Sequence, residues 1–192
     1  MIAMDFAARR RLRINGTLTS VTADGLRIDV DQAYGNCPKY IRQRHLVPDS
    51  PHSVAEGFRY DTQLSAEDTA LIRTADTFFL GTTHSEQSRD ASHRGGPAGF
   101  VRVPDANTLW WPDYPGNNMF NSLGNLVMDD AAALLFIDFT TGSTLQLSGV
   151  AEVEWGTPGA PGDDGGGGRR VRFTIQHIAR GHAQAYAGRS DE

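Results

Sequence analysis

Apolar and polar residues alternate in many short runs along this chain, and a two-residue period is typical of half-buried β-strands. Residues 1–6 and 9–18 predict two strands, and a turn at Asp24-Gly25 leads into a third strand over 26–30. One apolar face of these strands is expected to point inward, formed by Leu12, Ile14, Leu18, Leu26, Ile28 and Val30. Residues 33–63 show no regular period and predict an irregular segment.

The pattern becomes helical at residue 65. Ser65 is followed three positions later by Asp68, a pair that can form a capping box, and this predicts a helix over 66–75. A second helix is predicted within 117–130, where three large apolar residues recur at helical spacing.

Between residues 65 and 180 the remaining apolar runs predict six strands, over 77–83, 98–103, 108–111, 132–139, 144–155 and 169–178. The polar run 84–97 and the glycine-rich run 156–168 are interpreted as loops. Because short turns join most of the strands, their pairing is expected to be antiparallel. The fold class is therefore mainly β, a six-stranded antiparallel barrel with peripheral helices.

An internal repeat relates the start of the chain to this barrel. At an offset of 133 positions (138 − 5), residues 4–16 align with 137–149 without a gap and share an Asp-Phe pair, a leucine and a glycine. After loops of different length, 26–30 resembles 171–175. The first 30 residues are thus expected to be the back half of a second barrel copy whose front half is absent. Chance similarity between two β-hairpins is the alternative.

These patterns divide the chain into four parts. The expected parts are a partial hairpin repeat over 1–34, a linker over 35–64, the barrel over 65–180 and a tail over 181–192.

The composition of the chain limits the classes of function that it can have. The net charge of −5 gives no general field for nucleic acid, and the basic residues are arginines apart from Lys39. A single cysteine, Cys37, excludes an intrachain disulfide and suits a cytoplasmic location. No apolar run approaches the roughly 20 residues of a membrane span. We expect a cytoplasmic protein that binds neither nucleic acid nor membranes.

Three stretches, 76–103, 109–139 and 145–155, resemble the pyridoxamine 5'-phosphate oxidase-like FMN-binding split barrels. Residues 34–44, Tyr-Gly-Asn-Cys-Pro-Lys-Tyr-Ile-Arg-Gln-Arg, look like a segment that precedes this barrel in one bacterial branch of the family. The resemblance implies a split β-barrel, a homodimer, and an FMN site at the interface of two protomers.

The residues that the resemblance assigns to the FMN phosphate are chemically suited to an anion. The Ser-His-Arg-Gly-Gly segment offers hydroxyl, ring and guanidinium donors and two glycine amides, and the opening of the second helix offers amides and a favourable dipole. The phosphate candidates are Ser92, His93, Arg94, Asn117, Asn118, Asn121 and Ser122.

Other candidates are assigned to the flavin ring. By resemblance, the strand along the ring is formed by Gly99, Phe100, Val101 and Arg102, with Asp113 on the strand end beside it. Thr144 and Gln146 are expected to share an outward face that meets the cofactor. We expect no protein side chain to act as a general acid or base, and no metal.

The sequence departs from the family at one point that matters. The oxidases carry an Arg-Lys pair at the start of the second helix, whereas Asn121 and Ser122 are neutral here, so phosphate binding would depend on Arg94, Arg102 and backbone amides. The C-terminal arginine and histidine pattern of vitamin B6 oxidation is also absent from the sequence.

Two functions therefore remain open. The first is an FMN-dependent oxidoreductase that acts on a small-molecule substrate or electron donor. The alternative is a non-catalytic dimeric barrel that binds a flavin, a deazaflavin or haem weakly, or binds only a protein partner. The sequence assigns no role to Cys37.

Overall fold

The computed structural model describes residues 1–35, 38–48, 57–84, 89–116, 119–183 and 186–189. The N-terminal and linker strands are β1 (Ile2–Asp5), β2 (Arg10–Thr22), β3 (Gly25–Gly35), β4 (His45–Pro48) and β5 (Arg59–Asp61). The barrel elements are α1 (Ala66–Thr74), β6 (Thr77–Thr82), β7 (Asp90–Gly95), β8 (Thr108–Pro112), α2 (Asn121–Met128), β9 (Ala131–Ile137), β10 (Ser143–Trp155) and β11 (Arg169–His182). The last strand is β12 (Tyr186–Arg189).

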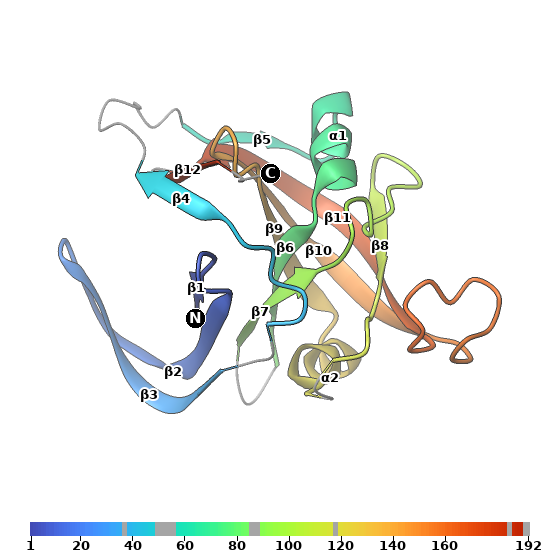
Figure 1. The fold of residues 1–192 in the computed structure, drawn as a ribbon, viewed down its shortest axis with the longest axis horizontal. Helices are drawn as coiled ribbons and strands as arrows, with labels where there is room; N and C mark the ends of the chain where they lie inside the picture. The colour runs from blue at the N-terminus through green and yellow to red at the C-terminus, as the bar shows by residue number, and fades with distance from the viewer. Residues whose placement is uncertain (36–37, 49–56, 85–88, 117–118, 184–185, 190–192) are drawn as a thin grey trace.

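Seven strands form one antiparallel sheet, which confirms the predicted mainly β class. The strand order is β5-β11-β10-β9-β6-β7, and β8 pairs with β11 beside this path. In Figure 1, α1 and α2 lie at opposite ends of the sheet, as the sequence predicted for the two helices. Five of the six predicted barrel strands became β6, β8, β9, β10 and β11, whereas β5 and β7 were not predicted as strands.

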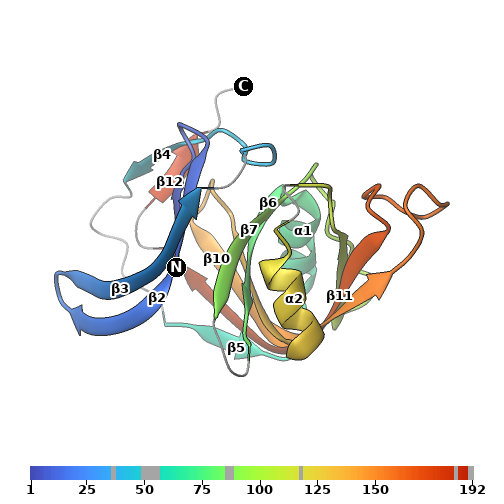
Figure 2. The same cartoon turned by 90° about the horizontal axis from the view of Figure 1, so that it is seen from below.

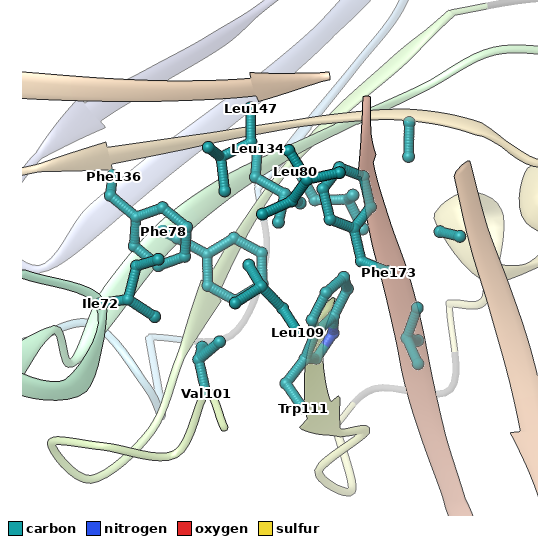
Figure 3. Close-up of a cluster of buried hydrophobic side chains, with 14 of the residues drawn as sticks. Ile72, Phe78, Leu80, Val101, Leu109, Trp111, Leu134, Phe136, Leu147 and Phe173 are labelled. Atoms are coloured by element: carbon teal, nitrogen blue, oxygen red, sulfur yellow. The ribbon is translucent and has the colours of Figure 1, made fainter. Parts of the chain in front are cut away.

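The strands of the barrel pack around an aromatic and aliphatic core. The ring of Phe78, fully buried, lies 5.0 Å from Trp111, 5.2 Å from Phe136 and 5.8 Å from Phe100, measured between centroids. Figure 3 shows this cluster with leucines from β6, β8, β9 and β10 around it. A core of this kind holds β6, β8 and β9 in fixed positions, so the polar side chains on the same strands are also fixed.

The capping box predicted for α1 is confirmed. The Ser65 side chain accepts a bond from the backbone N–H of Asp68, and the Asp68 carboxylate accepts one from the N–H of Ser65 at 2.7 Å. Asp68 also pairs with Arg180 on β11, which ties the first turn of the helix to the sheet.

Two predictions between 84 and 103 were wrong. The polar segment interpreted as a loop contains β7, an edge strand of the sheet. The apolar segment 98–103, interpreted as a strand, is instead a turn with positive φ at Gly99 and a single bridge at Arg102. The predicted succession of one helix, three strands, a second helix and three more strands is nevertheless observed, because β7 takes the place of the misassigned strand.

The prediction of irregular structure over 33–63 was also wrong in places. β3 extends to Gly35, β4 pairs with β12, and β5 pairs with β11. Part of the expected tail is likewise ordered, because β11 continues to His182 and β12 follows. These short edge pairings depend on backbone hydrogen bonds, so apolar alternation did not signal them. Cys37 lies outside the described residues.

The N-terminal strands form a separate three-stranded sheet, β1-β2-β3, beside β7 (Figure 1). In Figure 2 the β2–β3 hairpin projects away from the barrel. The apolar face predicted to point inward is largely exposed, with Leu12 at 42%, Leu18 at 53%, Leu26 at 60% and Val30 at 54%. Nothing among the described residues packs over this part of the hairpin, which is the physical reason for the error.

Candidate functional site

A cavity of about 110 Å³ lies where the N-terminal sheet, the linker and the barrel meet. We call it the arginine pocket, and its lining is Arg11, Arg13, Tyr40, Ser92, His93, Arg94, Gly95, Phe100, Trp111, Pro112, Asp113, Tyr114 and Gly116. Several of the sequence-predicted phosphate and ring residues therefore line one cavity, namely Ser92, His93, Arg94, Phe100 and Asp113.

Arg94, on β7, is held by two partners within the pocket. Its Nη1 donates to Asp113 Oδ1 at 3.2 Å, and its Nε donates to the Ser92 hydroxyl at 3.3 Å. Asp113 also accepts from Arg169 at 3.0 Å, so one carboxylate balances two guanidinium groups. Burial lowers the pKa of Arg94, and the neighbouring Asp113 opposes that shift. The guanidinium is thus oriented by fixed partners, and one net positive charge remains in this group of three.

A buried polar network lies behind β7. Arg13 forms an ion pair with Asp90 at 3.1 Å, with side chains 7% and 3% exposed. The Ser122 hydroxyl lies 2.6 Å from Asp90 Oδ2 and 3.0 Å from the Ser92 hydroxyl. Ser122, a predicted phosphate residue, is therefore part of the network that connects α2 to β7 and does not line the cavity.

Arg11 and His93 form the side of the pocket nearest the N-terminal sheet. Arg11 Nη1 lies 3.1 Å from the His93 carbonyl oxygen and 3.3 Å from its Nδ1. Burial, followed by the charges of Arg11 and Arg44, lowers the pKa of His93 to about 3. His93 is therefore neutral at physiological pH, and since Nδ1 accepts from Arg11, its proton is on Nε2.

The pocket has the charge and the donors that an anion requires. Three arginines and one aspartate line it, and the neutral histidine adds no charge of either sign. Because Arg13 is balanced by Asp90, the positive charge that remains comes from Arg11 and from the group of Arg94, Arg169 and Asp113. Two buried N–H donors, His93 Nε2 and Trp111 Nε1, have no hydrogen-bond partner among the described residues. Because such donors are costly to leave unpaired, an acceptor-rich ligand would be stabilised here.

The glycines of the Ser-His-Arg-Gly-Gly segment have a different role from the predicted one. A side chain at Gly95 would overlap the backbone carbonyl of Tyr40, and the amide of Gly96 already donates to the Asp76 carbonyl at 3.0 Å. The linker thus packs directly on the end of β7. Close chain packing explains Gly95, and the amide of Gly96 is engaged within the fold.

Other predicted ring residues lie outside the pocket. Gly99 and Val101 belong to the turn, Val101 is buried in the core, and Arg102 pairs with Asp164 at 3.4 Å. The expected strand along the ring is absent here, since only Phe100 of this group lines the cavity.

The remaining predicted residues are also placed elsewhere. Asn121 opens α2 and donates to the Tyr34 hydroxyl at 2.9 Å. Gln146 is exposed on β10, but Thr144, expected to face outward with it, is buried. Neither lines the pocket. Asn117 and Asn118 lie outside the described residues.

Sequence reasoning missed Arg11, Arg13 and Tyr40. A signal for the two arginines was nevertheless present in the repeat, because at the offset of 133 they align with Thr144 and Gln146, the residues expected to meet the cofactor. The signal for Tyr40 was the segment 34–44, which resembles a family element.

Two general features are absent from the described part of the chain. It contains no group of three or more His, Cys, Asp or Glu side chains able to hold a metal ion. None of its helices is long and apolar enough to cross a membrane.

The profile of the pyridoxamine 5'-phosphate oxidase family matches residues 64–159, which is half of the chain. The chain therefore belongs to this family, and the resemblance drawn from the sequence is confirmed. No curated protein matches the chain.

The chain is similar in structure to several solved proteins. A candidate pyridoxamine 5'-phosphate oxidase from Lactobacillus delbrueckii is 15% identical, with a TM-score of 0.51 over 64% of this chain and 98% of that one. HupZ from Group A Streptococcus is 15% identical, with a TM-score of 0.49 over 65% of this chain and 99% of that one. An FAD binding protein from Mycobacterium smegmatis is 15% identical, with a TM-score of 0.41 over 64% and 100%. The first of these likenesses shows a common split-barrel fold.

Proposed function

We propose that this protein is a flavin-binding oxidoreductase that holds the phosphate of FMN in the arginine pocket. The observation that carries the proposal is the pocket itself. Three arginines and one aspartate line it, and two of its buried N–H donors have no acceptor among the described residues. Family membership supplies the class of ligand, because the family's barrels are flavin-binding.

The residues of the pocket fit a phosphate-bearing flavin. Arg94 and Arg11 would hold the phosphate, since guanidinium groups match phosphate oxygens in geometry and charge. His93 and Trp111 would donate hydrogen bonds from their buried N–H groups. Phe100 and Tyr114, whose ring centroids lie 6.1 Å apart, offer an aromatic wall.

The bound flavin would supply the electron transfer, and the protein would bind and orient it. The pocket offers no side chain suited to general acid–base catalysis at neutral pH, because the pKa of His93 is about 3 and Asp113 is paired with two arginines. This supports the expectation that the chain contributes position and charge, with no proton-transfer group of its own.

We also propose that the protein forms a homodimer, and that a second copy covers the apolar face of the N-terminal hairpin. That face, defined by Leu12, Leu18, Val21, Leu26 and Val30, contributes five of the large apolar side chains exposed on the molecule. Because these exposed side chains are apolar, a second copy of the same face could cover them, as an isologous interface requires.

FMN titration followed by thermal unfolding tests the flavin proposal. A ligand that binds only the folded state stabilises it by about 2.7 kcal/mol at one hundred times its Kd, which raises the Tm of a domain of this size by roughly 5–10 °C. Arg94→Ala should weaken FMN binding at least about tenfold, the effect of losing one charge-assisted hydrogen bond.

Arg59→Ala is the matched control, because Arg59 lies exposed on β5 and does not line the pocket. It should bind FMN like the parent protein. An unchanged Tm for the parent protein at saturating FMN would contradict the proposal and favour a barrel that binds another ligand or only a protein.

A further inference from the structure

We infer that β1–β3 are a structural repeat of β9–β11, related to them by a local twofold axis, and that Arg11 and Arg13 therefore complete the phosphate pocket from within the same chain. The inference rests on the proposed flavin site and specifies how it is built. It replaces the expectation that a second protomer supplies this wall.

The pairing registers of the two sheets coincide. Ile2 on β1 pairs with Arg13 on β2. The residues 133 positions later, Leu135 on β9 and Gln146 on β10, are also paired with each other. The next two pairs along each ladder keep the same offset, although nothing in a β-hairpin requires its register to match that of another hairpin.

Both long hairpins also contain the same irregularity at the same place. The β2–β3 ladder shifts register immediately before Gly16, and the β10–β11 ladder shifts immediately before Gly149, 133 positions later. A side chain on Gly16 would overlap the carbonyl oxygen of Asp29, and one on Gly149 would overlap that of Thr174. A glycine bulge repeated against matching partner residues favours common ancestry over chance similarity.

An aromatic contact shows how the two copies are related in space. Phe6 and Phe139 occupy equivalent positions in the repeat, and their rings touch edge to face with centroids 5.1 Å apart. The Arg44 guanidinium lies over both rings and pairs with Asp76. Equivalent residues that contact each other lie close to a twofold axis, as in an isologous interface.

This axis gives Arg11 and Arg13 their position. They are the equivalents of Thr144 and Gln146, but on β2 they face the edge of β7. Arg13 Nε donates to the Ala91 carbonyl at 3.0 Å, and Arg11 Nη1 donates to the His93 carbonyl at 3.1 Å. Two side chains thus satisfy the open backbone acceptors of an edge strand and bring positive charge into the pocket opposite Arg94.

The same geometry accounts for the neutral Asn121-Ser122 pair. Ser122 is engaged by Asp90 and Ser92, and the cationic charge that the oxidases place at this helix start comes here from the N-terminal sheet. The ligand class is a phosphate monoester, because the guanidinium groups that line the pocket match phosphate oxygens in geometry and charge.

The test measures FMN affinity by quenching of flavin fluorescence for the parent protein, Arg11→Gln and Arg27→Gln. Arg11→Gln should raise the Kd at least about tenfold, with one FMN bound per chain in the parent protein. Arg27, exposed on β3 and outside the pocket, provides a control of equal charge change and should leave the Kd within about twofold.

Gln146→Ala separates this arrangement from its rival. If β10 of a second copy completed the pocket, Gln146→Ala would raise the Kd and Arg11→Gln would not, and that result would overturn the inference while leaving the flavin proposal intact. Failure of the parent protein to bind FMN would overturn both. Far-ultraviolet circular dichroism of each variant establishes that it is folded before its affinity is compared.

Discussion

Replacing Arg13 with methionine should destabilise the whole protein by breaking the most buried ion pair among the described residues. Arg13 and Asp90 are 7% and 3% exposed, and Asp90 Oδ1 has no hydrogen-bond partner among the described residues. Removing the guanidinium leaves a buried carboxylate whose hydrogen bond from a side chain of the described residues comes from Ser122, and such a loss costs about 3–5 kcal/mol. Against a total stability of roughly 5–15 kcal/mol, this is a large fraction.

Urea unfolding followed by tryptophan fluorescence measures this loss, because all three tryptophans belong to the barrel. The double variant Arg13→Met with Asp90→Asn removes the stranded charge and should recover at least about 2 kcal/mol of the loss. A single-variant loss below about 1 kcal/mol, or a double variant no more stable than Arg13→Met, would refute the reasoning.

Two further predictions concern acid stability and assembly. Burial raises the pKa of Asp68, but hydrogen bonds from Arg180 and Ser65 outweigh it and hold this pKa below its usual 3.8. The ionised carboxylate therefore stabilises the fold above about pH 4. This contribution is lost as the pH falls through the lowered pKa. The stability difference between the parent protein and Asp68→Asn in urea unfolding should therefore be constant near neutrality and smaller at pH 3, and a difference independent of pH would count against this assignment. Light scattering at micromolar concentration should give a dimer mass for the parent protein and a monomer mass for Leu18→Glu. Thr17→Glu is the control, because Thr17 lies on the opposite face of β2, and it should remain a dimer. A monomeric parent protein would exclude the proposed interface.

Sequence patterns predicted the barrel well where burial is apolar, and failed where it is polar. β7 was missed because its buried side chains are Asp90, Ser92 and His93, which contact Ser122 and Arg11 by hydrogen bonds in place of forming an apolar face. The segment 98–103 was misassigned for the opposite reason, since Phe100 and Val101 enter the core from a turn. A polar network can replace apolar burial only when its partners are in place, and those partners are distant in sequence.

The candidate site was predictable in part for the same reason. Ser92, His93, Arg94 and Asp113 came from the family resemblance and do meet in one pocket. Arg11 could be found only by combining the repeat with a knowledge of which face of β2 meets the barrel. That face depends on how two sheets dock, which neither periodicity nor composition records.

Binding of FMN through its phosphate in the arginine pocket is tested most directly by the absorbance spectrum of the freshly purified protein from about 300 to 700 nm. The expected result is the two-band spectrum of an oxidised flavin, with FMN identified by mass in the supernatant after heat denaturation. A Soret band, or a featureless spectrum that added FMN does not change, would contradict it.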